Sequence, residues 1–576
     1  MERAAATTST FFIALRRMRA PLIAIVAIYA VSIAGLTLIQ GVDAEGRPTP
    51  PLGFFDAFYF VSYTATTIGF GEIPTAFSYG QRMWVVVCIY LSVVGWTYSI
   101  VTVLNLLREE AFQYARAMQT FARRVRRMAD PFFLVAGFGE TGRLVCHALD
   151  HLGIPFVVID ESADRIDDTK LQDFQRDVPA FTADASNPEV LLLAGLRHPC
   201  CRGVIAITDE DATNLAVAMS VRLLNDLIPV MCRVQNKDIA ANMASFGTDH
   251  IINPFEKFAE YLSLAVRSPG SYQLLEWLTG VPGSELRPEA VPPHGHWVIA
   301  GFGRLGSEVA GCLAQHDMDL TVIAPDAGQV TAHRCVAGTG TEAGTLREAG
   351  IEHAVGIVAA SDNDVNNLSI AVTAKEVNPG LFVVIRRNRE SNRALFEAFG
   401  ANLEMVPSEI VAHECLAVLT TPLLSRFLAI VKQQDDAWAD AVVERLQRCA
   451  GTRVPATWTV ELNARSAPAI EWHLRRRDLV LARLLRNPGN REEWLDCHPL
   501  LLVRLGGEIL LPEPTTRIDA RDRILFAGTP QAASLQALVL SNRNAAEYIV
   551  TGRDATGAWV WEWLRARWQK TRTQRG

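Results

Sequence analysis

The feature that most constrains this chain is a short glycine-punctuated run between two long apolar segments. Residues 20–39 and residues 83–107 carry no charged side chain, and each segment is at least 20 residues long. A helix of about 20 apolar residues spans the hydrocarbon core of a bilayer, which is about 30 Å thick. Between them, residues 53–64 form an aromatic-rich segment that is too short to cross. The pattern predicts two membrane spans with a re-entrant helix and loop between them.

The loop that follows the short segment has the composition of an ion filter. A cation that loses its water needs replacement oxygens, and backbone carbonyls that all point to one side supply them when several chains surround one axis. Glycine adopts positive φ without a Cβ penalty, which allows successive carbonyls to be turned inward. An ordinary glycine turn of a soluble protein would not lie between two such spans. The predicted filter residues are Thr67, Ile68, Gly69, Phe70 and Gly71.

This run resembles the signature TVGYG of the tetrameric potassium channels. The resemblance implies a homotetramer in a lipid bilayer with potassium ions in the filter. Phe70 replaces the usual Tyr and Glu72 replaces the usual Asp, so a less selective cation channel stays an alternative. Glu72 would form a carboxylate ring at the outer mouth, or accept a structural hydrogen bond behind the filter. Gly95, inside the second span, is a candidate gating hinge or a site of close helix packing.

Charge and cysteine content restrict the partners and the compartment. The formal net charge of −7 over 576 residues argues against nucleic acid as a partner. The 10 cysteines show no CxxC pair, which predicts reduced thiols in the cytoplasm and leaves any metal unknown. Arginines precede the first span and cluster at residues 116–127, after the second span. The positive-inside tendency then places both termini in the cytoplasm of a multi-pass protein of the cell (inner) membrane.

The soluble part contains an internal repeat. Residues 132–142 are an apolar strand that leads into GxGxxG, and residues 297–306 repeat this pattern. In the first copy Gly137 permits the tight turn, Gly139 lets a pyrophosphate approach the backbone, and Gly142 lets the helix pack on the strand. Asp160 ends the second strand, where a carboxylate binds the ribose hydroxyls. The first copy is therefore predicted to bind NAD(H) or another adenine nucleotide rather than the NADP form.

The second copy departs from this pattern. Ala324 stands at the position of Asp160, and Asp326 comes two residues late. Its glycines are either structural or serve a different ligand, and the candidate second site is Gly301, Gly303, Gly306 and Asp326.

The order of these matches resembles the regulator-of-potassium-conductance family (RCK/KTN, Trk-type NAD-binding domains) over residues 132–264 and 297–419. The resemblance implies that Asp184 and Thr208 join the glycines and Asp160 at the first nucleotide site. For both residues, hydrogen bonding within the fold is an equal alternative. In this family eight such domains form a gating ring, which four chains of this kind would supply.

The predicted fold is multi-domain: a two-span α-helical pore domain with a re-entrant loop, two α/β Rossmann-like domains and a C-terminal α+β lobe. The predicted boundaries are the following: N-terminus 1–19; pore domain 20–107, with spans 20–39 and 83–107 and the pore helix and filter at 53–73; linker 108–130; first RCK domain 131–290; second RCK N-lobe 291–422; C-terminal lobe and tail 423–576.

The predicted function is a ligand-gated potassium channel. A membrane-tethered NAD-dependent oxidoreductase is the alternative from another class, but the sequence shows no catalytic residue set beside the first copy, so we expect no enzyme. Whether the nucleotide opens or closes the pore, which nucleotide is preferred, and whether a divalent cation such as calcium also acts are left open by the sequence.

Overall fold

The computed structural model describes residues 2–43, 46–72, 76–108, 110–280, 283, 285, 291–326, 328 and 332–553. These residues divide into two compact units. The first contains Met1–Ala129 with two short pieces, Pro179–Phe181 and Leu193–Gly195, and the second contains the rest of the chain.

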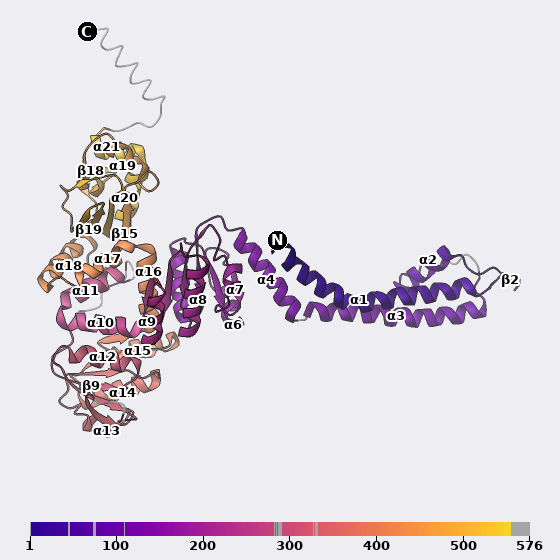
Figure 1. Cartoon of the computed structure of the whole chain (residues 1–576), viewed down its shortest axis with the longest axis horizontal. Helices are drawn as coiled ribbons and strands as arrows, with labels where there is room; N and C mark the ends of the chain where they lie inside the picture. The colour runs from indigo at the N-terminus through magenta and orange to yellow at the C-terminus, as the bar shows by residue number, and fades with distance from the viewer. Residues whose placement is uncertain are drawn as a thin grey trace, which may run out of the picture. The chain divides into compact units, whose positions relative to one another are not determined.

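The first unit is a helical hairpin with a short helix beside it. Its elements are α1 (Glu2–Leu38), β1 (Gly41–Val42), β2 (Pro48–Thr49), α2 (Phe54–Ala65), α3 (Tyr79–Arg108) and α4 (Glu110–Arg126). Helices α1 and α3 pack side by side, and α2 lies along them (Figure 1). Segments Met18–Leu38 and Tyr79–Leu106 are long and apolar enough to cross a membrane, as predicted. Helix α1 begins well before its span, because residues 2–19 contain no glycine or proline to stop a helix.

Small residues let the two long helices approach closely. The Trp84 indole donates a hydrogen bond to the Ser32 carbonyl over 3.1 Å, and a Cβ on Gly35 would lie 2.0 Å from its ring. Phe60 and Tyr63 of α2 pack in the same buried cluster as Leu36 of α1. Further along, Phe121 of α4 stacks on the ring of Phe181, with centroids 5.1 Å apart.

The second unit begins with a six-stranded sheet of order β5-β4-β3-β6-β7-β8. The pairs β3–β4, β3–β6, β6–β7 and β7–β8 are parallel, and β3 and β4 are buried throughout, as strands covered on both faces are. The elements of this first copy are β3 (Phe132–Ala136), α5 (Glu140–His151), β4 (Phe156–Asp160), α6 (Ala163–Leu171), β5 (Ala180–Thr182), α7 (Pro188–Leu193), β6 (Cys201–Ala206), α8 (Asp211–Leu224), β7 (Val230–Arg233), α9 (Lys237–Ser245), β8 (His250–Ile252), α10 (Pro254–Arg267) and α11 (Pro269–Thr279).

A second sheet repeats this topology with the order β11-β10-β9-β12-β13-β14, and all its neighbouring strands are parallel. The elements of this second copy are β9 (His296–Ala300), α12 (Arg304–Ala314), β10 (Asp319–Ala324), β11 (Arg334–Ala337), α13 (Ala343–Glu348), β12 (Gly356–Ala359), α14 (Asp364–Val377), β13 (Phe382–Arg386), η2 (Glu390–Asn392), α15 (Arg393–Phe399), β14 (Leu403–Met405), α16 (Pro407–Thr420) and α17 (Pro422–Val431). Helices α16 and α17, bent by 116°, would add a third candidate span if they were one broken segment.

The C-terminal lobe is built on an antiparallel sheet of order β15-β22-β19-β20. Its elements are α18 (Asp436–Ala450), β15 (Ala456–Glu461), α19 (Pro468–Leu474), β16 (Leu479–Val480), η3 (Leu481–Leu485), β17 (Arg486–Asn487), β18 (Asn490–Trp494), β19 (Cys497–Arg504), β20 (Gly507–Leu510), β21 (Arg517–Ile518), β22 (Arg523–Gly528), α20 (Pro530–Ser541) and α21 (Arg543–Thr551). The predicted fold class is thereby confirmed. The tryptophan-rich end of the predicted tail, from residue 554 onward, lies outside the described residues.

Candidate functional site

The predicted filter follows directly from the end of α2. The backbone N–H groups of Ile68 and Gly69 both donate to the Tyr63 carbonyl, over 3.0 and 3.2 Å. The φ angle is positive at every second residue, with 61° at Thr67, 65° at Gly69 and 74° at Gly71. Alternation of left- and right-handed backbone turns successive carbonyls toward the same side, which is the arrangement that a carbonyl-lined ion path needs.

Glu72 is held behind this loop by two tyrosines of the pore helix. The Tyr59 hydroxyl donates to Glu72 Oε2 over 3.1 Å, and the Tyr63 hydroxyl donates to the Glu72 carbonyl over 2.9 Å. These hydrogen bonds join Glu72 to α2, and its place at the outer mouth stays a prediction. Sequence reasoning missed both tyrosines, although their spacing of four residues on one helix places them on the same face.

Gly95 lies within an unbroken helix. α3 is continuous over Tyr79–Arg108, and a Cβ on Gly95 would lie 2.5 Å from Cδ1 of Ile28 on α1. This geometry supports close packing, and a gating hinge at Gly95 stays a prediction.

The first glycine loop connects β3 to α5 and is shaped by steric contact. Gly137 has φ of 106°, which L side chains rarely adopt. A Cβ on Gly142 would lie 2.2 Å from the Gly137 carbonyl oxygen, so no other residue fits there. Gly139 caps α5 without a side-chain hydrogen bond, and a Cβ there would meet its first neighbour at 3.7 Å. The protein around Gly139 therefore leaves room for alanine.

Asp160 sits at the end of β4 beside this loop and is 4% exposed. Its Oδ2 accepts a hydrogen bond from the Phe138 N–H over 2.6 Å, and its Oδ1 accepts one from the Ser162 N–H over 2.9 Å. Arg165 Nη1 lies 3.5 Å from Oδ2. The carboxylate thus fixes the glycine loop, and Arg165, which sequence reasoning missed, stands beside it. Asp160 ends a strand and Arg165 lies in the helix that follows, so no single periodicity joins the two residues in the sequence.

The remaining predicted residues of the first site bond within the fold. The Asp184 carboxylate accepts from the N–H and hydroxyl of Ser186, over 2.7 Å each. The Thr208 hydroxyl donates to the Asn214 side chain over 2.9 Å. Both follow strand ends on the same side of the sheet as Asp160. Their predicted contact with a nucleotide stays a prediction, as does that of Gly137, Gly139, Gly142 and Asp160.

The second glycine loop has the same shape and different surroundings. Gly301 has φ of 101°, and a Cβ on Gly306 would lie 1.9 Å from the Gly301 carbonyl oxygen. Gly303 has no atom within 4 Å of an added Cβ. Strand β10 ends at Ala324, where no carboxylate stands. Asp326 Oδ1 accepts a hydrogen bond from the Gly328 N–H over 3.1 Å, so a turn in its own loop engages it.

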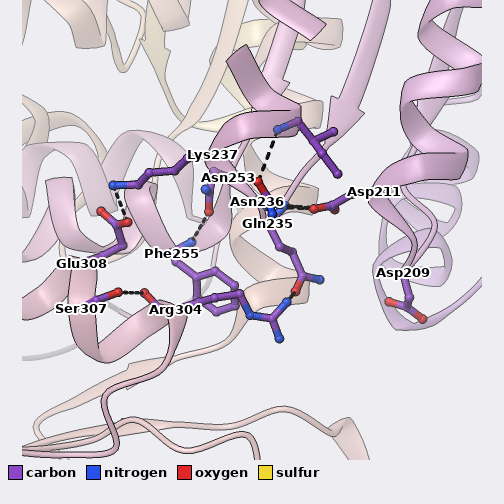
Figure 2. A pocket seen from close by; sticks show the side chains of 11 residues that line it. Asp209, Asp211, Gln235, Asn236, Lys237, Asn253, Phe255, Arg304, Ser307 and Glu308 are labelled. Atoms are coloured by element: carbon purple, nitrogen blue, oxygen red, sulfur yellow. Dashed lines mark hydrogen bonds and ion pairs between the residues drawn. The ribbon is translucent and has the colours of Figure 1, made fainter. Parts of the chain in front are cut away.

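A cavity of about 510 Å³ lies between the two copies (Figure 2). In Figure 2 the side chains of Lys237 and Glu308 point toward one another, and their Nζ and Oε1 atoms are 2.6 Å apart. This hydrogen bond raises the pKa of Lys237. Arg304, at the start of α12, bonds to the Gln235 side chain and lies over the Phe255 ring. Polar contacts between the copies therefore line this cavity, and Asp209, which also lines it, pairs with Arg165.

The part of the chain that the structure describes contains no prepared metal site, and two of its buried cysteines are unreactive thiols. No group of three or more His, Cys, Asp or Glu side chains in these residues is placed to hold a metal ion. Burial raises the pKa of the Cys201 thiol to about 11 and that of Cys312 to about 11, so both thiols are protonated at neutral pH.

Two family models match the chain. Residues 23–109 match the ion channel model, and residues 133–254 and 297–407 match the TrkA-N domain model. The chain therefore carries an ion channel domain followed by two TrkA-N domains, as predicted from the filter and the repeat.

Known proteins with similar sequences include two from Methanocaldococcus jannaschii. Probable potassium channel protein 2 is 24% identical over 221 residues, which are 38% of this chain and 60% of that protein. Potassium channel protein 1 is 21% identical over 202 residues, which are 35% of this chain and 59% of that protein. The chain thus spans about three fifths of the length of these relatives. Among solved structures, the GsuK channel bound to NAD is 16% identical with a TM-score of 0.44, covering 93% of this chain and 100% of that chain.

Proposed function

We propose that this chain, which joins an ion channel domain to two TrkA-N domains, is a homotetrameric potassium channel gated by an adenine nucleotide. The observation that carries the proposal is the alternation of positive φ at Thr67, Gly69 and Gly71. Such a loop, repeated around a fourfold axis, presents rings of carbonyl oxygens that replace the hydration shell of a potassium ion. The relatives named as potassium channel proteins support the same substrate.

The channel proposal is tested by ion flux. Purified chain in liposomes should pass potassium, and reversal potentials in mixed potassium and sodium should follow the potassium gradient. Equal permeability to both ions would favour the less selective channel that Phe70 and Glu72 allow. Tyr59→Phe removes the hydrogen bond to Glu72 and should lower selectivity or the duration of conduction, while Tyr90→Phe, on the exposed face of α3, serves as the control.

Orientation follows from the distribution of arginines. Arg16, Arg17 and Arg19 precede the first span, and the last turn of α4 carries Arg123, Arg124 and Arg126. Both clusters flank the spans on the same side, so the positive-inside rule places the termini and both TrkA-N domains in the cytoplasm. A cytoplasmic ligand then acts through α4, which follows the inner helix along the chain and leads into the first TrkA-N domain.

The regulatory ligand is assigned to the first TrkA-N domain. The glycine loop offers the N-terminus of α5 to phosphates, and the Asp160 carboxylate at the end of β4 suits the ribose hydroxyls and repels a 2′-phosphate. Gating requires that the nucleotide bind the open and closed channel with different affinities. A tenfold difference at each of four sites is worth about 5.5 kcal/mol, which is enough to switch the pore.

Asp160→Asn tests this assignment. The amide keeps one oxygen for the Phe138 N–H but loses the charge, so we expect the response of single channels to NAD, NADH and ADP on the cytoplasmic side to disappear while conduction persists. Asp326→Asn in the second domain is the matched control and should leave the response intact. An unchanged dose-response in Asp160→Asn would show that the nucleotide binds elsewhere, and hydride transfer to an added substrate would favour the oxidoreductase alternative.

A further inference from the structure

Arg165 occupies a position that the nucleotide proposal above does not yet use. It lies in the first turn of α6, and its side chain is 42% exposed. Its guanidinium bridges two carboxylates, with Nη1 at 3.5 Å from Asp160 Oδ2 and Nη2 at 3.6 Å from Asp209 Oδ2. Both distances exceed the 2.7–2.9 Å of a strong charge-assisted hydrogen bond. The cation is therefore weakly held in place.

This bridge crosses the mouth of the first glycine loop. Asp160 ends β4 and Asp209 follows β6, and these two strands flank β3, whose end carries the loop. A Cβ on Gly139 would lie 3.7 Å from Arg165 Nη1. The guanidinium thus lies over the N-terminal end of α5, where a helix of 12 residues offers its free N–H groups to an anion.

Both carboxylates keep other partners when Arg165 moves. Asp160 retains the N–H donors of Phe138 and Ser162, and Asp209 retains Arg233 Nη1 at 2.7 Å. Both carboxylates therefore stay paired when Arg165 moves. The motion avoids the free-energy cost of a buried carboxylate without a partner.

We propose that Arg165 is the phosphate-binding residue of the first TrkA-N domain and that it excludes adenine ligands without phosphates. The inference rests on the proposed nucleotide site. A diphosphate at the start of α5 draws the guanidinium away from Asp160 and Asp209 and accepts two N–H donors from it, because arginine matches phosphate oxygens as a planar fork. The same motion uncovers the Asp160 carboxylate for the ribose hydroxyls. A ligand without phosphates leaves the bridge in place and meets a covered carboxylate.

The test compares ADP with adenosine. Calorimetric titration of the purified full-length chain in detergent gives the dissociation constants of both ligands for the native chain, Arg165→Gln, Arg165→Lys and Lys170→Gln. Lys170 is the control, because it lies on the same helix and pairs with Asp167 at 2.6 Å on an exposed surface. We expect Arg165→Gln to weaken ADP binding at least tenfold while adenosine binding stays the same or strengthens. Arg165→Lys should retain part of the ADP affinity, and Lys170→Gln should bind both ligands as the native chain does.

Two results overturn the proposal in distinguishable ways. If the native chain binds ADP and Arg165→Gln either binds it equally well or loses ADP and adenosine by the same factor, the role of Arg165 in phosphate binding is wrong while the nucleotide site stands. If the native chain does not bind ADP, the proposed nucleotide site itself fails, and this assignment fails with it. Unchanged thermal unfolding of Arg165→Gln without nucleotide shows that a loss of affinity comes from the site and not from the fold.

Discussion

The two TrkA-N domains share one backbone and differ in where they place charge. The Gly137 N–H donates to the Ile159 carbonyl over 2.8 Å, and the equivalent Gly301 N–H donates to the Ile323 carbonyl over 2.9 Å. The next residue along each strand is Asp160 in the first domain and Ala324 in the second. The first domain therefore has a carboxylate at its glycine loop, and the second has none at that position.

In the second domain a buried charge lies near β14, which is on the other side of β9 from β10 in the strand order. Arg387 is 2% exposed and bonds to Glu404, to Glu390 over 2.6 Å and to Glu409 over 3.1 Å. In the first domain the equivalent residue is the fully buried Val234, whose N–H bonds to β8 as that of Arg387 bonds to β14. The two copies therefore share the glycine-dependent backbone of the loop and differ in where their charged residues lie.

The largest expected effect is loss of the Arg387 network. Arg387→Met leaves the Glu404 carboxylate, which is 16% exposed, without its cation, and breaking a buried pair in this way costs about 3–5 kcal/mol. Hydrogen exchange of residues 382–409 should accelerate at least a hundredfold, while residues 230–256 of the first domain remain protected. Arg389→Met, on an exposed residue, is the control, and Arg387→Met with Glu404→Leu should restore much of the protection. Equal acceleration in both domains would mean that they unfold as one unit.

A smaller effect on ADP binding should distinguish Gly139 from Gly303, the middle glycines of the two GxGxxG loops. Gly139 has φ −73° and ψ −159°, and Gly303 has φ −84° and ψ −158°, which are conformations open to alanine. An added Cβ meets the protein at 3.7 Å or more at Gly139 and at nothing within 4 Å at Gly303. We expect Gly139→Ala to weaken ADP binding at least tenfold with unchanged thermal unfolding, and Gly303→Ala to change neither. If Gly303→Ala lowers the number of ADP molecules bound per chain, the second domain also holds a nucleotide.

The sequence predicted the fold of both copies because their signals are local. The buried strand, the GxGxxG turn and the following helix lie within about 30 residues, and Gly142 and Gly306 are required by contacts with their own loops. The absence of a carboxylate at Ala324 was also visible in the sequence. The partners of Asp160 and Glu72 were not, because Arg165, Tyr59 and Tyr63 reach them through side-chain geometry. The Arg387 network joins β13, η2, β14 and α16, which only the folded sheet brings together.

Acid should weaken the Arg387 network of the second domain. Burial opposes the charge of Glu390, but the hydrogen bonds from Arg387 and Arg393 outweigh it and lower the pKa of this carboxyl. Because the folded-state pKa lies below the unfolded value of about 4.3, the stabilisation is present at neutral pH and is lost as the pH falls below that value. Hydrogen exchange, corrected for its intrinsic pH dependence, should show a few-fold loss of protection in residues 382–409 between pH 6 and pH 4. Glu390→Gln should remove part of this dependence.

The smallest expected effect concerns the contact between the domains. Lys237 of the first domain pairs with Glu308 of the second at 2.6 Å, but the lysine side chain is 61% exposed. Solvent screens such a pair, so its coupling energy in a double-mutant cycle of Lys237→Gln and Glu308→Gln should be about 0.2–1 kcal/mol and should shrink at high salt. The pKa of Lys237 is raised in the folded chain. The pair therefore contributes its full stabilisation below the unfolded pKa of about 10.4, and this stabilisation is lost as the pH rises through the folded pKa. A coupling energy above this range would contradict this expectation. A shift of the nucleotide response in the single variants would show that the Lys237–Glu308 pair couples the two domains.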